Sequence, residues 1–157
     1  MIDLRLDVPF HPALAFELTT KGGATDFALV IAACESFGPY CLIRGLGVNC
    51  YVEPVYTLDA DIVAVAENLA ELSHHLRGEG FVLETFQNSV NARRAGSELR
   101  IQFTTDPRYQ AFIARAEEHE VLGLRAKVAC REDVTQGKLW GVQRPKRPLE
   151  QAKEGRA

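Results

Sequence analysis

Segments with helical spacing of apolar residues alternate with strand-like segments along this chain from residue 25 onward. In residues 25–37, apolar side chains recur at the three- and four-residue intervals of an amphipathic helix. In residues 98–103 they recur at every second position, the period of a strand with one buried face. Interleaved helices and short strands are typical of α/β and α+β domains. The sequence therefore predicts a mixed central sheet flanked by helices.

The expected elements follow from local signals. Helices are expected from Thr25 or Asp26 as the N-cap residue, from Glu67, just after Pro107 and from Arg131. Gly38-Pro39 should end the first of them. The expected strands cover residues 40–43, 61–65, 81–86, 98–103 and 121–129, with Asp59 just ahead of the second strand.

Length and charge favour one globular domain. The 157 residues can bury one core, so we expect a single domain over residues 1–143 and a basic tail over residues 144–157. A net charge of -3 gives no overall attraction to nucleic acid. Arg93-Arg94 and the tail are basic; a solvated surface is the simple interpretation, and RNA contact is the alternative.

The chain shows no sign of a membrane or secreted protein. No apolar run has the length of a membrane span, and the first residues lack the apolar core of a secretory signal. The four cysteines form no Cys-x-x-Cys pair, and three of them stand in apolar segments, so reduced and packed thiols are expected. These features predict a cytoplasmic protein without a membrane partner.

Asp59 and Asp61 are the residues with the clearest chemical potential. Side chains two residues apart on an extended segment project from the same face, roughly 6–7 Å apart along the strand. Two carboxylates held in this way can share one or two Mg²⁺ ions together with nucleotide phosphates. Such ions orient a nucleoside triphosphate and stabilise charge while oxygens exchange at phosphorus. Taken alone, the pair is weak evidence for this chemistry, and a polar strand entrance is its simple interpretation.

A glycine-containing turn precedes the acidic pair. Residues 42–49 are Leu-Ile-Arg-Gly-Leu-Gly-Val-Asn, residues 53–57 are Glu-Pro-Val-Tyr-Thr, and residues 59–61 are Asp-Ala-Asp. This order of strand, glycine turn, spacer and acidic strand resembles the signature of the DNA polymerase β-type nucleotidyltransferase superfamily. It is most similar to the AbiEii-like nucleotidyltransferases, a family that includes toxins of toxin–antitoxin systems. The likeness extends over residues 28–145, where a later Lys138-Leu139 pair also fits.

The resemblance implies a nucleotidyltransferase fold and transfer of a nucleoside monophosphate from a nucleoside triphosphate to an acceptor. It implies that Asp59 and Asp61 are catalytic and bind Mg²⁺, and that the nucleotide is bound by Arg44, Gly45, Asn49, Thr57 and Lys138. A tRNA end, a protein hydroxyl and a small molecule all remain open as acceptors. A cognate antitoxin is a further partner that the resemblance suggests.

Two departures from the superfamily pattern keep a second interpretation open. The first glycine of the usual pair is Arg44, and Gln102 stands where a third acid is usual. Glutamine can contact a metal or water, but it cannot act as an anionic base. Glu98 is expected on the same face as Gln102, about 13 Å away along the strand. Asp106 could supply the third acid only if the loop after the strand folds back. The alternative is a catalytically degenerate module that binds a nucleotide or a protein.

Overall fold

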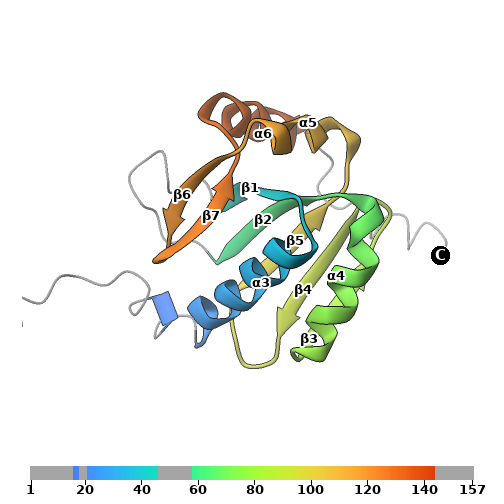
Figure 1. Cartoon of the computed structure of the whole chain (residues 1–157), viewed down its shortest axis with the longest axis vertical. Coiled ribbons are helices and arrows are strands. Elements are labelled where there is room, and N and C mark those ends of the chain that lie inside the picture. The colour runs from blue at the N-terminus through green and yellow to red at the C-terminus, as the bar shows by residue number, and fades with distance from the viewer. Residues whose placement is uncertain (1–15, 18–20, 46–57, 144–157) are drawn as a thin grey trace, which may run out of the picture.

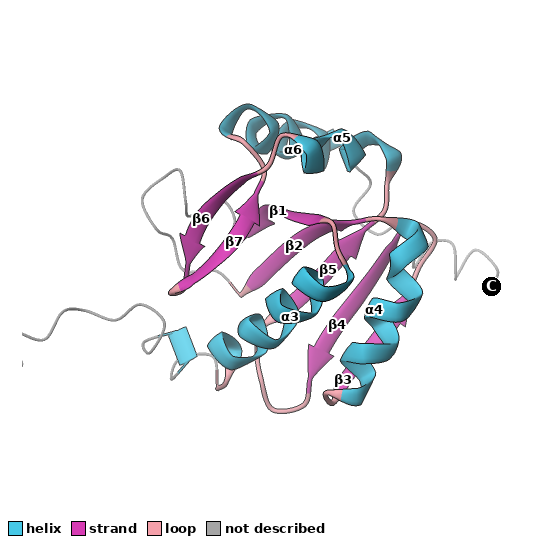
Figure 2. Ribbon diagram, viewed as in Figure 1, coloured by secondary structure: helices cyan, strands magenta, loops and turns pink. Residues whose placement is uncertain are grey.

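A seven-stranded mixed sheet forms the centre of the protein, in the order β3-β4-β5-β2-β1-β7-β6 (Figures 1 and 2). The computed structural model describes residues 16–17, 21–45 and 58–143, with side chains as far as residue 140. β2 runs antiparallel to β1 and parallel to β5, while β1 runs parallel to β7. The strands are β1 (Tyr40–Gly45), β2 (Asp59–Ala64), β3 (Phe81–Thr85), β4 (Ser89–Arg94), β5 (Arg100–Thr104), β6 (Glu117–Val121) and β7 (Leu124–Val128).

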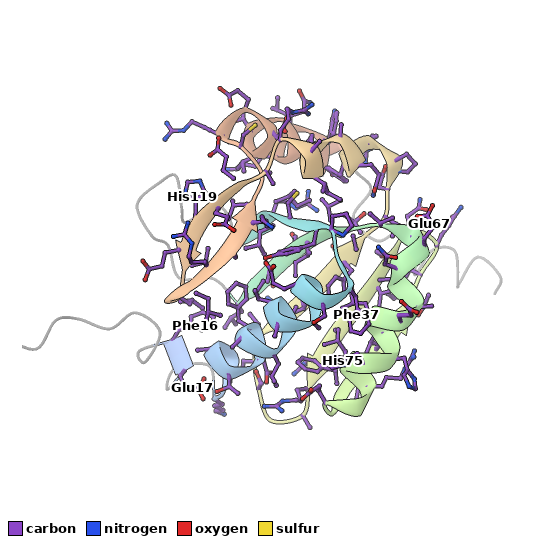
Figure 3. The ribbon with its side chains drawn as sticks, viewed as in Figure 1. Phe16, Glu17, Phe37, Glu67, His75 and His119 are labelled. Atoms are coloured by element: carbon purple, nitrogen blue, oxygen red, sulfur yellow. The ribbon has the colours of Figure 1, made fainter. Side chains whose placement is uncertain are left out.

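Helices α3 (Gly23–Phe37) and α4 (Ala66–Gly78) cover one face of this sheet (Figure 1). They pack against each other, and the Phe37 ring lies 5.4 Å from the ring of His75 (Figure 3). Fully burying a large apolar side chain contributes about 1.5–3 kcal/mol. The strand residues that face this core are therefore apolar, and their neighbours along the strand face the opposite side of the sheet. The strand residues in the core include Leu42, Ala60, Ile62, Val90, Ala92, Ile101, Phe103 and Val128.

The opposite face of the sheet is covered mainly over β1 and β2. The 3-10 turn η2 (Pro107–Tyr109) and helices α5 (Gln110–Ala114) and α6 (Arg131–Gln143) pack there against Cys41, Ile43 and Val63. The rings of Phe112 and Trp140 stack at 5.7 Å, with the fully buried Tyr109 edge-on to both. In the described part of the chain, no helix is long and apolar enough to cross a membrane.

One strand of each of two hairpins was not predicted. β4 was not predicted, because only Val90 and Ala92 point from it into the core and the residues beside them, Ser89, Asn91 and Arg93, are polar. The single strand expected over residues 121–129 contains only the turn at Leu122-Gly123 and β7, and the preceding hairpin strand β6 was not predicted. β6 is an edge strand in which Glu117, Glu118 and Glu120 are exposed, and charged side chains are common on such edges.

The start of the first long helix was predicted wrongly. α3 begins at Gly23, and neither Thr25 nor Asp26 is its N-cap. The Glu17 carboxylate, near the start of α3 in Figure 3, instead accepts hydrogen bonds of 2.8 Å from the Thr25 backbone N–H and hydroxyl. Asp26 is fully buried, with its carboxylate 2.8 Å from Arg94 Nε. The carboxylate near the helix start therefore serves an internal ion pair.

Candidate functional site

Asp59 and Asp61 lie on the face of β2 that α3 and α4 leave uncovered. Between and after them, Ala60 and Ile62 point into the core, and strand alternation sends the two acids to the opposite side. Both acids line one cavity of about 700 Å³. That volume is typical of small-molecule sites. The acidic pair predicted from the sequence therefore opens into a shared cavity.

Three further polar side chains stand in one row with Asp61 across the sheet. Asp61 pairs with Gln102 on β5, Gln102 with Asn91 on β4, and Asn91 with Glu84 on β3. With strands spaced at about 4.8 Å, the row extends roughly 14 Å from Asp61 to Glu84. All four residues line the cavity, so the polar side of β2, β5, β4 and β3 forms its floor.

A guanidinium from the neighbouring strand holds Asp61. The register of β1 shifts after Leu42, which places Arg44 directly opposite Asp61. Arg44 Nε donates a hydrogen bond to Asp61 Oδ2 at 2.9 Å. Its Nη1 donates to the Tyr109 hydroxyl at 3.2 Å and to the Gly137 carbonyl at 3.4 Å. Burial lowers the pKa of Arg44, but the Asp61 carboxylate and the Tyr109 hydroxyl outweigh it, and the pKa lies above its usual value.

Asp59 is paired more loosely. Arg100 Nε donates to Asp59 Oδ1 at 3.0 Å, but the two side chains are 61% and 49% exposed. Ion pairs in such positions typically contribute about 0–1 kcal/mol. Arg100 can therefore leave Asp59 at little cost, whereas the Arg44 side chain has several partners.

Gly45 ends β1 next to the acids. Its φ of +65° lies in the left-handed region, and a Cβ at this position would collide with the backbone oxygen of Asp59. The close approach of β1 to the start of β2 thus accounts for glycine here. A role of Gly45 toward phosphate stays a prediction, and Asn49 and Thr57 lie outside the described residues.

The other candidates from the sequence do not meet the acidic pair. Lys138 is exposed on α6 and is not among the residues that line the cavity. Glu98 lies 3.6 Å from Lys21, and Asp106 accepts a hydrogen bond of 2.9 Å from the backbone N–H of Arg108. Neither acid lines the cavity, and the third carboxylate of the described lining, Glu84, lies on β3, three strands away from Asp61.

Sequence reasoning missed the far half of the cavity floor. Glu84, Asn91 and Arg93 line it, and Asn91 and Arg93 belong to the strand that was not predicted. The alternation of Val90 and Ala92 with Asn91 and Arg93 was the available signal. This short alternation identifies a strand only together with the pairing of β4 with β5, which the sequence does not show.

The donor set suits a single Mg²⁺ better than a pair. Among the described residues, no group of three or more His, Cys, Asp or Glu side chains could hold a metal ion. Mg²⁺ is nevertheless often bound by one or two carboxylates together with substrate phosphates. Asp59 fits that role directly, while Asp61 would have to share its carboxylate with Arg44. Gln102 offers a neutral amide oxygen in place of a third anion.

Comparisons with known proteins give a fold. No family model matches the chain, and no curated protein matches its sequence. Solved structures do match: LnuA, a lincosamide antibiotic adenylyltransferase with lincomycin bound, has a TM-score of 0.56 at 13% identity, over 71% of this chain and 83% of that one. A Thermotoga maritima protein proposed to be a nucleotidyltransferase has a TM-score of 0.55 at 12% identity, over 84% and 89% of the two chains. ANT(2″)-Ia in complex with adenylyl-2″-tobramycin has a TM-score of 0.55 at 17% identity, over 80% and 83%.

These similarities define the class: this is a protein of nucleotidyltransferase fold. The fold predicted from the sequence is confirmed. At these identities the likeness concerns the fold alone, and the narrower resemblance to AbiEii-like proteins stays a prediction.

Proposed function

We propose that this protein binds a nucleoside triphosphate with Mg²⁺ at Asp59 and Asp61 and transfers its nucleoside monophosphate to an acceptor hydroxyl. The observation that carries the proposal is the shared cavity: both carboxylates line it, on a fold in which similar structures are nucleotidyltransferases. Gly45 brings the end of β1 against the start of β2, so any ligand at that bend lies beside Asp59.

Asp59, Arg44 and Gln102 would have different roles in this reaction. Mg²⁺, when bound, would neutralise phosphate charge and orient the nucleotide for in-line displacement. Asp59 is half exposed and its partner Arg100 can move, which suits a metal ligand and a proton acceptor. Arg44 holds a fixed positive charge beside Asp61, where it can offset phosphate charge. Gln102 cannot take the acceptor's proton, which therefore passes to a carboxylate of the pair or to water.

A second candidate is a module that binds a nucleotide without transferring it. Its support is the same Arg44 side chain, because a guanidinium bound to Asp61, Tyr109 and Gly137 competes with a metal ion for the carboxylate. Gln102, directly opposite Asp61, supports it too, because the site then lacks the third anion.

The acceptor and the biological setting are less constrained. A tRNA end, a protein hydroxyl and a small molecule are compatible with the cavity. A toxin role opposed by a cognate antitoxin is supported only by the sequence resemblance. Copurification of a stable complex with the product of an adjacent gene tests that role.

Nucleotide binding and transfer can be measured separately. Each of the four ribonucleoside triphosphates is titrated with and without Mg²⁺, and the protein is then incubated with α-labelled nucleotide and cell lysate. We expect Mg²⁺-dependent binding and a labelled product, both lost in Asp59→Asn and retained in Glu120→Gln, an exposed carboxylate on β6. Binding without any labelled product would favour the second candidate. Absence of nucleotide binding would contradict both.

A further inference from the structure

Two charged side chains on the cavity floor lack partners within the described part of the chain. The other charged lining residues are in ion pairs: Asp59 with Arg100, Asp61 with Arg44, and Arg94 with Asp26. Glu84 and Arg93 form no ion pair or side-chain hydrogen bond with the described residues. The same holds for the side-chain amides of Asn91 and Gln102. Their hydrogen-bonding capacity is therefore available to a ligand.

The sheet register places the two unpaired charges close together. Glu84 lies opposite Asn91, and Val82 lies opposite Arg93, so Glu84 and Arg93 are diagonal neighbours on β3 and β4. Diagonal neighbours on one face of an antiparallel pair are about 7–8 Å apart. One anion and one cation thus face the cavity side by side, next to two carboxamides and the 68% exposed Val82.

This part of the cavity lies away from the glycine bend. The lining comes from β2, β5, β4 and β3, and from the β4–β5 connection, and it includes neither Arg44 nor Gly45 of β1. If the nucleotide phosphates bind between the bend and the acidic pair, the remaining floor is left for the second substrate. The inference rests on the proposed function in this one respect.

We propose that the Glu84–Arg93 floor is the acceptor subsite and that it takes a small zwitterion carrying a hydroxyl group. Its ammonium group pairs with Glu84, its carboxylate with Arg93, and its hydroxyl reaches toward Asp59 and Asp61. A volume of about 700 Å³ suits a small molecule. Equal numbers of acids and arginines in the lining favour a zwitterion over a polyanion.

The length of the acceptor is limited by the row from Asp61 to Glu84. That row extends roughly 14 Å between backbones. If the Glu84 side chain leans toward Asp61, the gap between their carboxylates is about half as long. A hydroxyl separated from the charged groups by a ring or a chain of similar length fits this gap, in which the floor presents the side chains of Asn91 and Gln102. Free tyrosine has these dimensions and serves as the probe.

The proposed reaction balances with the nucleotide as the only co-substrate. The acceptor oxygen attacks the α-phosphorus and forms a new phosphoester bond. The bond from that phosphorus to the oxygen bridging to the β-phosphorus breaks, and pyrophosphate leaves. The hydroxyl proton passes to Asp59 or to water.

Binding of the acceptor can be tested without nucleotide by isothermal titration calorimetry on the full chain. We expect tyrosine and phenylalanine to bind equally, because the hydroxyl is needed for transfer only. Tyramine lacks the carboxylate and 3-(4-hydroxyphenyl)propionate lacks the amine, so each should bind roughly tenfold more weakly, as expected for the loss of a charged hydrogen bond.

Matched variants connect these preferences to the two residues. Glu84→Gln should weaken tyrosine binding roughly tenfold and remove the preference over the amine-free probe. Arg93→Gln should remove the preference over tyramine in the same way. Glu120→Gln on β6 and Arg77→Gln on α4, both exposed, should leave binding unchanged.

The outcomes separate this inference from the proposed function. Failure of tyrosine to bind, or binding indifferent to Glu84 and Arg93, overturns the zwitterion subsite even if labelled nucleotide is transferred to another acceptor. Zwitterion binding with the expected variant pattern supports the subsite, even where no nucleotide transfer is found and the proposed function fails. Preferential binding of a single-stranded RNA oligonucleotide over tyrosine also overturns it.

Discussion

Arg44 and Asp61 face each other across β1 and β2, with Arg44 Nε donating to Asp61 Oδ2 at 2.9 Å. The same guanidinium reaches the Tyr109 hydroxyl and the Gly137 carbonyl, so it links the acidic pair to η2 and α6. A carboxylate that would bind a metal is thus already neutralised by the protein. This contact connects the packing of η2 and α6 on the sheet to the chemistry of the site.

Arg44→Ala should strengthen Mg²⁺ binding in the absence of nucleotide, because Asp61 loses a competing cation. The same change should lower the free energy of unfolding by about 1–3 kcal/mol, since Asp61 and Tyr109 lose a partly buried partner. Calorimetric Mg²⁺ titration and urea unfolding measure the two effects. Arg100→Ala is the control, with little change in stability expected for its exposed pair. Unchanged Mg²⁺ affinity in Arg44→Ala would show that Asp61 is not a metal ligand.

Gly45→Ala should disrupt the site by displacing β2. The added methyl group collides with the Asp59 backbone oxygen, and the residue must also keep a φ of +65°. We expect a loss of more than about 2 kcal/mol of stability and of nucleotide binding. Gly123→Ala isolates the backbone effect, because Gly123 has a φ of +82° and open space around it. That variant should lose only about 1–2 kcal/mol and should retain nucleotide binding. Equal losses in the two variants would show that the contact with Asp59 is unimportant.

The buried Asp26 should make Arg94 important for folding. Asp26 Oδ1 lies 2.8 Å from Arg94 Nε, but the contact is not aligned as a hydrogen bond, and neither carboxylate oxygen accepts one within the described part of the chain. Arg94→Ala leaves a buried charge without compensation and should cost about 3–5 kcal/mol. The double variant Asp26→Ala/Arg94→Ala should be more stable than Arg94→Ala alone.

Urea unfolding of these variants tests that assignment. Arg125→Ala is the control, because its pair with Glu118 is largely exposed on both sides and should contribute little. If Arg94→Ala is no more destabilising than Arg125→Ala, the buried pair does not hold α3 against β4.

The sequence was sufficient for the parts of the fold with strong apolar periodicity. The α3 stripe, β1, α4 and the alternation around Ile101 predicted their elements to within a few residues, and the acidic pair was predicted with its shared face. β4 was missed because its two core residues, Val90 and Ala92, are flanked by polar ones that line the cavity. Local patterns contain no register, so the row from Arg44 through Asp61 to Glu84 could not be predicted. Asp26 was predicted as an N-cap because no local pattern indicates its ion pair with Arg94, 68 positions later in the chain.

The buried thiols should make the protein less stable in alkali. Burial raises the pKa of Cys34 far above its usual value and that of Cys41 to about 12, because the thiolate is poorly solvated inside the core. In the unfolded chain both thiols ionise near the ordinary value of 9.0. The folded state then binds more protons than the unfolded state, so the stabilising contribution is present below the ordinary pKa of 9.0 and falls as pH rises above it. Each thiol should lower the free energy of unfolding by about 1.4 kcal/mol per pH unit once the unfolded form is ionised.

Urea unfolding at a series of pH values measures this slope, and Cys34→Ala and Cys41→Ala should each flatten it. A slope identical in the variants and the parent chain would assign the alkaline loss to other groups.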